Sequence, residues 1–342
     1  MTAAPEDHED VRVGVVGLGF GRCHAKVLST MAGVDLVAVA DLDPEGQGID
    51  LEPYAEKLGA NGYRDGTEMI RRESLDAIVI AVPPRARARL IAEAGERGVA
   101  IFLEKPFATD DEHAREMGEL CDRFPDVPIM MDFCLRHLPA VAGLRELLDG
   151  PLGEALVVNA DLMLPRDDSP PWIWDPANGN GVVNENTCHL LDTLCFLMGE
   201  PVRVMAAGKS YLGNPLEDGV AVVITFASGA TAVLTGGALG AQAMATPASL
   251  SVYTARGQAR LTGLHHMFGD LTWATAASAE PTRQSWALPA RGAISEYALS
   301  HFIGSLRGGT APSPDRRAGV LTVRLAMAVR RSLETGESVS VA

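Results

Sequence analysis

Apolar runs and helix-like segments alternate along the chain from residue 11 to about residue 130. The strand-like runs lie at residues 11–16, 36–40, 77–82 and 100–103, and the helix-like segments lie at 23–31, 51–58 and 87–97. A strand, a helix and a further strand in succession are typical of right-handed βαβ units. The first part of the chain is therefore predicted to form a parallel sheet with helices on its faces.

The pattern changes at about residue 154, where several strand-like runs alternate between apolar and polar residues. These runs lie at 154–164, 203–211, 220–226, 231–235, 250–254 and 283–288, and Gly, Pro and Ser turns separate most of them. Alternation indicates a sheet with one buried face, whose other face meets solvent or a partner. Helices are predicted at 186–197 and 316–333. The expected fold class is α/β, with an amino-terminal parallel sheet followed by a carboxyl-terminal α+β domain that has a large, mostly antiparallel open sheet.

Length and composition agree with two domains. A chain of 342 residues exceeds what one hydrophobic core usually supports, and 47% hydrophobic residues are enough for two cores. The boundary is predicted between residues 132 and 133, within a seam from Met131 to Arg136. Residues 1–10, which are rich in Asp and Glu, are expected to be disordered.

The net charge argues against one class of partner, and the cysteines and the start of the chain indicate the compartment. A net charge of −15 argues against a nucleic-acid partner, because binding to phosphates draws on clustered Lys and Arg. The five cysteines have no zinc-like CxxC spacing, so free thiols in a reducing compartment are expected, without disulfides or structural zinc. The start of the chain lacks the basic and apolar regions of a signal peptide, and no apolar run reaches about 18 residues. A cytoplasmic protein without a membrane partner is expected.

A glycine-rich loop follows the first predicted strand. Gly17, Gly19 and Gly21, with Phe20 among them, lie between that strand and a helix, where glycines permit a tight turn and close approach of a pyrophosphate. Arg22 stands where a third glycine of the usual spacing is expected, so a plain strand–helix turn is the alternative.

Asp41 ends the second predicted strand, a little over ~20 residues past the glycines, where a carboxylate can accept hydrogen bonds from both adenosine ribose hydroxyls. The same charge would repel a 2′-phosphate, so NAD is expected rather than NADP. Helix capping by the acidic pair Asp41 and Asp43, ahead of Pro44, is the alternative role.

Two further strand ends carry candidate chemistry. Pro83 and Pro84 break regular structure where the chain is expected to pass the nicotinamide half of a cofactor, although a Pro-Pro pair is also a common loop signal. Glu104 and Lys105 follow the next strand, ahead of a proline with which the lysine can form a cis bond. Ligands bind outside the carboxyl ends of parallel strands, so Lys105 can donate a proton to a carbonyl oxygen while Glu104 supports it. A surface salt bridge is the alternative.

The segment from Gly179 to Asp192 carries a second candidate group. On a helix, Glu185, His189 and Asp192 share one face, and a histidine there can accept a proton from a hydroxyl as hydride leaves. Glu185 or Asp192 would orient the histidine or the substrate. A structural histidine at a domain seam is the alternative, and a metal site is disfavoured. The candidate substrate contacts are Trp172, Trp174, Asn186 and Arg136. An indole face suits the C–H side of a pyranose, although both tryptophans could equally pack in the core.

Together these residues resemble the Gfo/Idh/MocA family of NAD(P)-dependent oxidoreductases. The resemblance covers nearly the whole chain and includes Gly17-Leu18-Gly19 with His24-Ala25, Asp41-Leu42-Asp43-Pro44, Glu104-Lys105-Pro106, Asp132 to Pro139, Gly153-Glu154, Gly179 to Asp192 and Ser332 to Gly336. It implies a Rossmann dinucleotide-binding domain at 1–132 and a substrate-binding domain at 133–342, whose open sheet often forms the oligomer interface. Lys105 and His189 match the family's catalytic pair.

Three positions depart from the pattern that many members share. Glu185 stands where Asp is frequent, Thr187 where Gly is common and Arg87 where His is frequent. The resemblance implies hydride transfer between NAD(H) and a secondary alcohol or ketone of a sugar, inositol or related polyol, a class that includes nucleotide sugars and aminoglycoside-type substrates. A homodimer or homotetramer is expected. The alternatives are a non-catalytic, NAD-bound sensor or scaffold and a reductase of a non-sugar carbonyl or imine.

Overall fold

The structure is a computed structural model, and it describes residues 10–166, 171–176, 181–244, 247–264, 267–290 and 293–341. The chain divides into two compact units. The first unit holds residues up to 107, 115–132 and 295–317, and the second holds 108–114, 133–294 and 318 onward. Of the amino-terminal segment expected to be disordered, only Asp10 lies within the described residues.

The first unit is built on a six-stranded sheet in the order β3-β2-β1-β4-β5-β6, and every pairing in it is parallel. Its strands are β1 (Val11–Val16), β2 (Val34–Ala40), β3 (Asn61–Tyr63), β4 (Ala77–Ile80), β5 (Ala100–Leu103) and β6 (Ile129–Met131). β4 and β5 are buried along their whole length, as expected for strands with both faces covered. The parallel sheet expected from the sequence is confirmed, and its strand order is that of a Rossmann fold.

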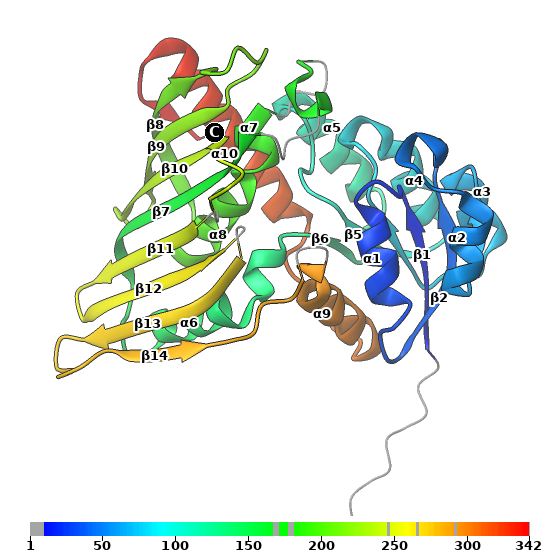
Figure 1. The fold of residues 1–342 in the computed structure, drawn as a ribbon, viewed down its shortest axis with the longest axis horizontal. Coiled ribbons are helices and arrows are strands. Elements are labelled where there is room, and N and C mark those ends of the chain that lie inside the picture. Colours follow the sequence, from blue (N-terminus) through cyan, green and yellow to red (C-terminus); the bar gives the residue numbers. More distant parts are fainter. Residues whose placement is uncertain are drawn as a thin grey trace, which may run out of the picture. The chain divides into compact units, whose positions relative to one another are not determined.

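Helices follow the strands of this sheet along the chain (Figure 1). They are α1 (Gly21–Leu28), α2 (Leu51–Leu58), α3 (Gly66–Arg72), α4 (Ala88–Glu96) and α5 (Asp111–Asp122), whose first residues belong to the second unit. A later segment also joins this unit and includes α9 (Glu296–Arg307). The ring of Phe302 in α9 lies 5.5 Å from that of Phe102 in β5.

The return of residues 295–317 covers the β6 edge of the sheet. The Met131 N–H donates to the carbonyl of Pro314 at 2.8 Å, and Met130 forms an isolated bridge with Asp315. An unpaired edge strand exposes a row of backbone donors and acceptors, so a covering segment satisfies them. The chain therefore passes between the two units at several points and not only between residues 132 and 133.

The second unit contains a nine-stranded sheet in the order β14-β13-β12-β11-β7-β10-β9-β8-β15. Its strands are β7 (Ala155–Pro165), β8 (Pro201–Lys209), β9 (Gly219–Phe226), β10 (Thr231–Gly240), β11 (Pro247–Thr254), β12 (Gly257–Leu264), β13 (Met267–Thr275), β14 (Thr282–Ser285) and β15 (Val339–Ser340). β7 and β10 pair in parallel, and the other neighbours pair antiparallel. The large, mostly antiparallel sheet expected from the sequence is confirmed.

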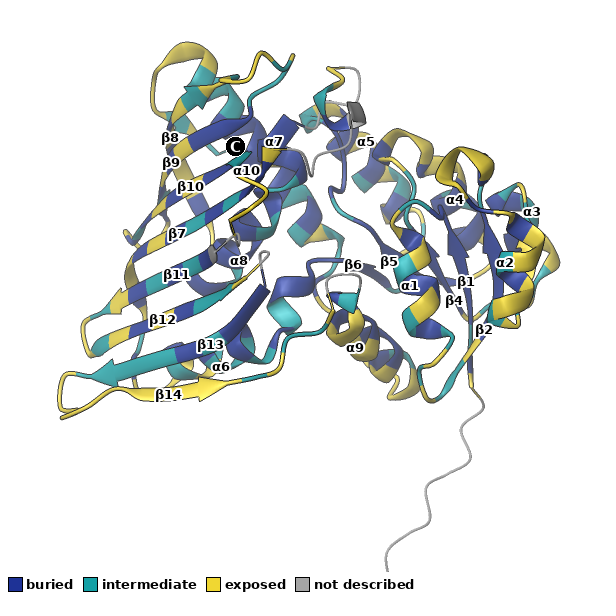
Figure 2. Ribbon diagram, in the orientation of Figure 1, coloured by how far each residue is buried: buried dark blue, intermediate teal, exposed yellow. Residues whose placement is uncertain are grey.

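Helices pack on one face of this sheet, and the other face is open (Figures 1 and 2). The helices of the unit are α6 (Pro139–Asp149), α7 (Gly181–Glu185), α8 (Cys188–Met198) and α10 (Arg316–Thr335). Along β8 and β9 buried and exposed residues alternate, which is the signature of a half-covered sheet. Within the described ranges, no helix combines the length and apolar character needed to cross a membrane. All five cysteines carry free thiols.

Candidate active site

The glycine loop after β1 leaves room for a ligand at one of its three glycines. Gly17 has φ +92°, and a Cβ there would lie 2.6 Å from the backbone oxygen of Ala81, so a larger residue is excluded. A Cβ on Gly21 would lie 3.1 Å from that of Ala81, which indicates a packing role. A Cβ on Gly19 would meet only the end of the Gln47 side chain, at 3.4 Å. Packing within the protein therefore does not require glycine at position 19. The space that a Cβ would occupy there is free for the close approach of a pyrophosphate.

Asp41 connects this loop to the end of β2. Its carboxylate accepts hydrogen bonds from the backbone N–H groups of Leu18, at 2.5 Å, and Asp43, at 2.8 Å. Each carboxylate oxygen has two acceptor sites, so the half-buried side chain can still accept from ribose hydroxyls. Phe20, which precedes α1, is exposed. The residues present thus fit the adenosine and pyrophosphate parts of NAD.

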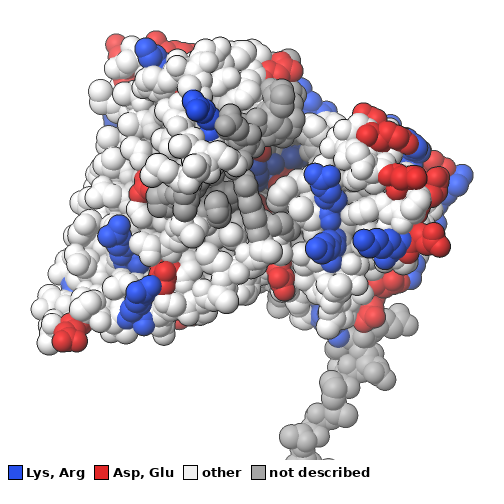
Figure 3. Space-filling model, in the orientation of Figure 1, with Lys and Arg blue, Asp and Glu red and all other residues white. Residues whose placement is uncertain are grey.

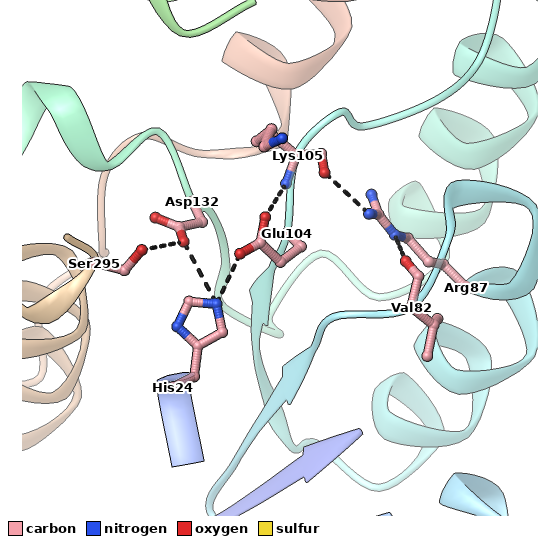
Figure 4. A network of polar contacts seen from close by, with 7 residues as sticks. All are labelled: His24, Val82, Arg87, Glu104, Lys105, Asp132 and Ser295. Carbon is pink, nitrogen blue, oxygen red and sulfur yellow. Dashed lines mark hydrogen bonds and ion pairs between the residues drawn. The ribbon is translucent and has the colours of Figure 1, made fainter. Parts of the chain in front are cut away.

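Lys105 lies at the carboxyl end of β5, where charged side chains meet (Figure 4). Its backbone N–H donates to Glu104 Oε2 at 3.1 Å, and its peptide bond to Pro106 is cis. The other oxygen of Glu104 lies 2.7 Å from Nε2 of His24, which belongs to α1. Glu104 and His24 are both buried, so they form an interior ion pair. This contact excludes an exposed salt bridge as the role of Glu104.

Asp132 places a second carboxylate near the same ring nitrogen of His24 (Figure 4). One of its oxygens lies 3.7 Å from His24 Nε2 and accepts a hydrogen bond from the Ser295 hydroxyl at 2.6 Å. Three possible metal-ligand atoms of His24, Glu104 and Asp132 lie within 4.8 Å of one another. The 2.7 Å contact between His24 and Glu104 is a hydrogen-bond distance, so a shared proton accounts for the arrangement.

The pKa values of this cluster move apart. Burial raises the pKa of Glu104, but the hydrogen bond and charge of His24, with the charges of Lys105 and Arg87, outweigh it and lower the pKa to about 2. Burial disfavours charge on His24, yet the hydrogen bond from Glu104 and the nearby carboxyl charges raise its pKa overall. Burial, followed by the charge of Glu104, raises the pKa of Asp132 to about 7. Near neutral pH Glu104 is therefore ionised, whereas His24 and Asp132, whose pKa values are raised, hold protons more strongly than usual.

Pro83 and Pro84 follow β4, the neighbour of β5 in the sheet. Pro84 begins a short 3₁₀ helix, Pro84–Ala86, and is buried, whereas Pro83 is exposed. The buried Arg87 follows this 3₁₀ helix, and its guanidinium donates to backbone carbonyls on both strand ends (Figure 4).

Glu185 and His189 lie on two consecutive helices of the second unit, and not on the single helix that the sequence analysis used to place them. α7 ends at Glu185, and α8 begins at Cys188 after a turn. The Thr187 N–H donates to the Val182 carbonyl five residues back, so one extra residue is accommodated at the junction. Glu185 is buried, and His189 is partly accessible. The expectation that Glu185, His189 and Asp192 share one face of a continuous helix is therefore wrong, because Glu185 belongs to a separate helix.

Asp192, one helical turn after His189, is engaged by Arg136. The Arg136 guanidinium donates to both carboxylate oxygens, from Nε at 2.7 Å and from a terminal nitrogen at 2.6 Å. The ring of Phe196 lies 5.0 Å from the guanidinium carbon. Burial raises the pKa of Asp192 to about 6 against the opposing charge and hydrogen bonds of Arg136. Two residues proposed separately from the sequence thus form one bidentate pair.

The junction between α7 and α8 holds polar atoms that have no hydrogen-bond partner among the described residues. They are Asn184 Oδ1, Asn186 Nδ2 and Thr187 Oγ1, and all three are buried. The amide nitrogen of Asn184 donates to the Ala108 carbonyl at 3.0 Å, which fixes the direction of that side chain. Buried polar groups normally have partners, so these atoms are suited to a bound molecule rich in hydrogen-bonding groups.

The remaining candidate residues precede α7. Trp174 ends the 3₁₀ helix Pro171–Trp174 and is half-buried. The side chain of Trp172 and residues 177–180, which include Gly179 and Asn180, lie outside the described residues. The expectation that the site binds no metal stays a prediction.

Sequence reasoning did not assign functions to His24, Asp132, Ser295 or Arg87. His24 and Glu104 are 80 positions apart, and Ser295 and Asp132 are 163 positions apart. No local pattern links residues at such separations. The signals available were the family resemblance, whose motifs include His24 and Asp132, and the position of Arg87, which departs from the family pattern.

Comparisons with known proteins agree with this geometry. Residues 11–133 match the model described as the oxidoreductase family, NAD-binding Rossmann fold. Residues 141–260 match the model described as the GFO/IDH/MocA C-terminal domain. Together the two models span more than half of the chain.

Similar proteins include several dehydrogenases. A D-apiose dehydrogenase from Paraburkholderia graminis is 29% identical over 96% of this chain and 88% of its own length. An inositol 2-dehydrogenase from Rhizobium meliloti is 28% identical over 97% of this chain and 99% of its own. The solved structure of levoglucosan dehydrogenase in complex with NADH has a TM-score of 0.85 and 20% identity, and covers 98% of this chain and 100% of that chain. At that identity the last similarity shows the fold alone.

Proposed function

Because the chain belongs to the Gfo/Idh/MocA family of oxidoreductases with an NAD-binding Rossmann fold, we propose that it transfers a hydride between NAD(H) and a secondary alcohol or ketone of a sugar, inositol or related polyol. The inositol and apiose dehydrogenases among its relatives support this substrate class. Nucleotide sugars and aminoglycoside-type substrates lie within the same class.

The residues that carry this function lie at the carboxyl ends of four neighbouring strands. In the sheet order β2-β1-β4-β5, these ends bear Asp41, the loop starting at Gly17, Pro83 with Pro84, and Lys105. Ligands of open parallel sheets bind along this edge. This alignment of a cofactor cradle with a lysine is the single observation that supports hydride chemistry most strongly.

NAD(H) supplies the hydride acceptor or donor. Gly17, Gly19, Phe20, Gly21 and Asp41 would hold its adenosine and pyrophosphate parts. Pro83, Pro84, Glu104 and Lys105 would line the nicotinamide side. The carboxylate of Asp41 would repel a 2′-phosphate, which supports NAD in preference to NADP.

Lys105 and His189 would handle the proton of the reacting group. The Lys105 ammonium would hold the oxygen that changes between alcohol and ketone and would stabilise negative charge on it. His189 would accept the hydroxyl proton in oxidation and return it in reduction. Glu185 would orient His189 or the substrate. The pair of Asp192 and Arg136 would hold α8, the helix that carries His189, in place. Arg136 would donate hydrogen bonds to the substrate from its remaining N–H groups.

The buried polar atoms of Asn184, Asn186 and Thr187 support a hydroxyl-rich substrate. Each can donate to or accept from a hydroxyl group, and an apolar carbonyl compound would leave all three uncompensated. The Trp172 and Trp174 rings would contribute a flat apolar face for the C–H side of a sugar ring. This preference for hydroxyls is what favours a polyol over a non-sugar carbonyl or an imine.

Lys105→Ala tests the assignment on a panel of sugars, inositols and polyols. We expect NAD affinity close to that of the wild type and a kcat lower by about 10²-fold or more, as for loss of a residue that acts on the reacting proton. Full turnover in the variant contradicts the proposed role. Tight NAD binding without turnover of any panel member by the wild type favours the sensor or scaffold, and turnover of a non-sugar carbonyl or imine alone favours the other alternative.

We also propose that the open face of the nine-stranded sheet joins copies of this chain in a homodimer or homotetramer. Val233 lies opposite Val223, and Val223 lies opposite Met205, so exposed apolar side chains form a stripe across β10, β9 and β8. Uncharged residues dominate the visible surface of this unit (Figure 3). Exposed apolar patches mark interfaces.

Light scattering of Val233→Glu tests this interface. We expect a smaller assembly than the wild type forms, whereas Met244→Glu, at a loop residue that is 70% exposed, leaves the assembly unchanged. A wild-type monomer or an unaffected Val233→Glu assembly overturns the proposal. The five free thiols support a cytoplasmic location, which cell fractionation tests.

A further inference from the structure

Arg87 is a charged residue with almost no access to solvent. Its exposed fraction is 2%, and it is among the largest fully buried side chains of the protein. A guanidinium is expensive to remove from water unless its donors are satisfied. Packing alone would be served at lower cost by an apolar side chain, so the hydrogen bonds of Arg87 must account for its place.

The guanidinium of Arg87 binds the backbone of two strand ends. Nε donates to the carbonyl of Val82 at 2.8 Å, one terminal nitrogen donates to the carbonyl of Lys105 at 3.2 Å, and the other donates to the carbonyl of Pro106. Val82 follows β4, and Lys105 follows the adjacent β5. The rigid fork of an arginine can bridge several acceptors at once, which a lysine cannot do.

Glu104 binds the backbone of Lys105 from its other side. It accepts from the Lys105 N–H, while Arg87 donates to the Lys105 carbonyl (Figure 4). Both backbone polar groups of Lys105 are therefore bound by buried, charged side chains. Glu104 is fixed in turn by its hydrogen bond with His24. Because the Lys105 backbone is held from both sides, the starting point of its side chain is fixed.

We propose that Arg87 is a positioning residue that sets Lys105 relative to the turn from Val82 to Pro84. The role rests on the function proposed above, in which that turn lines the nicotinamide side of the cofactor. By tying the turn to the lysine, Arg87 fixes the distance between the cofactor edge and the group that holds the reacting oxygen. Rates of this kind fall steeply when reacting groups are displaced by about 1 Å.

Arg87→Lys is the direct test, because it keeps the charge and removes the fork. We expect kcat to fall about 10- to 100-fold, with NAD affinity within about twofold of the wild type. The matched control is Arg145→Lys, since Arg145 also donates to two backbone carbonyls, those of Phe196 and Leu197, within the second unit. The control is expected to retain the wild-type kcat.

A double variant separates positioning from a general loss of structure. If Arg87 acts through Lys105, adding Arg87→Lys to Lys105→Ala leaves the residual rate of the single Lys105→Ala variant unchanged. If Arg87 has only a structural role, Arg87→Lys lowers the rate of Lys105→Ala by the same factor by which it lowers the rate of the wild type. That result overturns the proposal. The control is a circular-dichroism melt of each variant.

The pH profile of kcat/KM and the primary deuterium isotope effect of Arg87→Lys need no residual activity of the lysine variant. A displaced lysine changes the isotope effect and the limb of the profile that Lys105 controls, whereas a smaller active fraction leaves both as in the wild type and overturns the proposal. If Lys105→Ala itself retains full turnover, the proposed function fails. If Lys105→Ala is impaired while Arg87→Lys turns over normally, only the positioning role fails.

Discussion

Replacing Arg136 with methionine tests how the second unit keeps a buried carboxylate charged. Asp192 has an exposed fraction of 1%, and Arg136 donates to both of its oxygens. The influences that lower the pKa of Asp192 are the charge and the hydrogen bonds of Arg136, while burial raises it. In the Arg136→Met variant only burial remains, so the pKa of Asp192 rises further above about 6.

The sign of the stability change follows from proton binding. In the wild type the folded-state pKa of about 6 exceeds the ordinary 3.8, so the folded state binds a proton that the unfolded state releases. The contribution of Asp192 to stability therefore falls as pH rises from about 4 to about 6 and is then constant. In the variant this fall continues above pH 6 at about 1.4 kcal/mol per pH unit. The deficit relative to the wild type should thus grow between pH 6 and pH 8, by at most about 3 kcal/mol.

Tryptophan fluorescence during urea unfolding measures this deficit in the second unit alone. All four tryptophans, Trp172, Trp174, Trp273 and Trp286, belong to that unit. The free energies of unfolding of wild type and variant are compared at pH 6 and pH 8. The Arg136→Met/Asp192→Asn variant is the control, because it has the same methionine without a titrating carboxyl group.

Two results would refute the reasoning. One is a deficit of Arg136→Met that is the same at pH 6 and pH 8. The other is a control variant whose deficit depends on pH as strongly as that of Arg136→Met. The first outcome means that the cost of the substitution comes from lost packing against the arginine and not from a buried charge. The second means that the pH dependence comes from a titrating group other than Asp192.

Three further substitutions test the first unit. Asp41→Ala removes a hydrogen-bond acceptor beside the glycine loop, so it should lower the affinity for NADH about 10-fold and reduce the preference for NADH over NADPH. Titrations that follow cofactor fluorescence measure both affinities. If the wild type binds NADPH more tightly than NADH, the premise is contradicted. Gly17→Ala brings a Cβ within 2.6 Å of the Ala81 oxygen at φ +92°, and should lower the melting temperature and weaken NAD binding; unchanged values contradict this. Glu104, with a pKa of about 2 against an ordinary 4.5, contributes stability that is lost as pH falls from about 4.5 to 2, so Glu104→Gln should be less stable at pH 6 and show a weaker acid dependence by circular dichroism.

Several elements of the fold follow from local patterns. The predicted helix at 51–58 and the predicted strands at 11–16 and 100–103 have the bounds of α2, β1 and β5. In each case a short apolar run or one amphipathic face identifies the element, because burial acts on neighbouring residues together. β12, by contrast, has mostly small and polar residues, and it is held by pairing with β11 and β13 on either side. Its local sequence does not mark it as a strand.

The candidate site divides in the same way. The glycine loop, Asp41 and Lys105 were identified because strand ends and glycine spacing can be read locally. The break between Glu185 and His189 was not predicted, since the residues around it are compatible with a continuous helix and an i→i−5 hydrogen bond interrupts it. The sequence also contains Arg136 and Asp192 without indicating that they pair across 56 positions.

The sequence by itself determined most of the strands and helices and their order, the parallel and antiparallel character of the two sheets, and the strand ends that carry glycine, carboxylate and amine groups. These features depend on residues close together in the chain. The tertiary structure alone decided that His24 pairs with Glu104, that Arg87 bridges two strand ends and that Arg136 neutralises Asp192. The energy of a buried charge depends on which groups lie within a few ångströms of it and on how much water is excluded, and both are set by packing between distant segments.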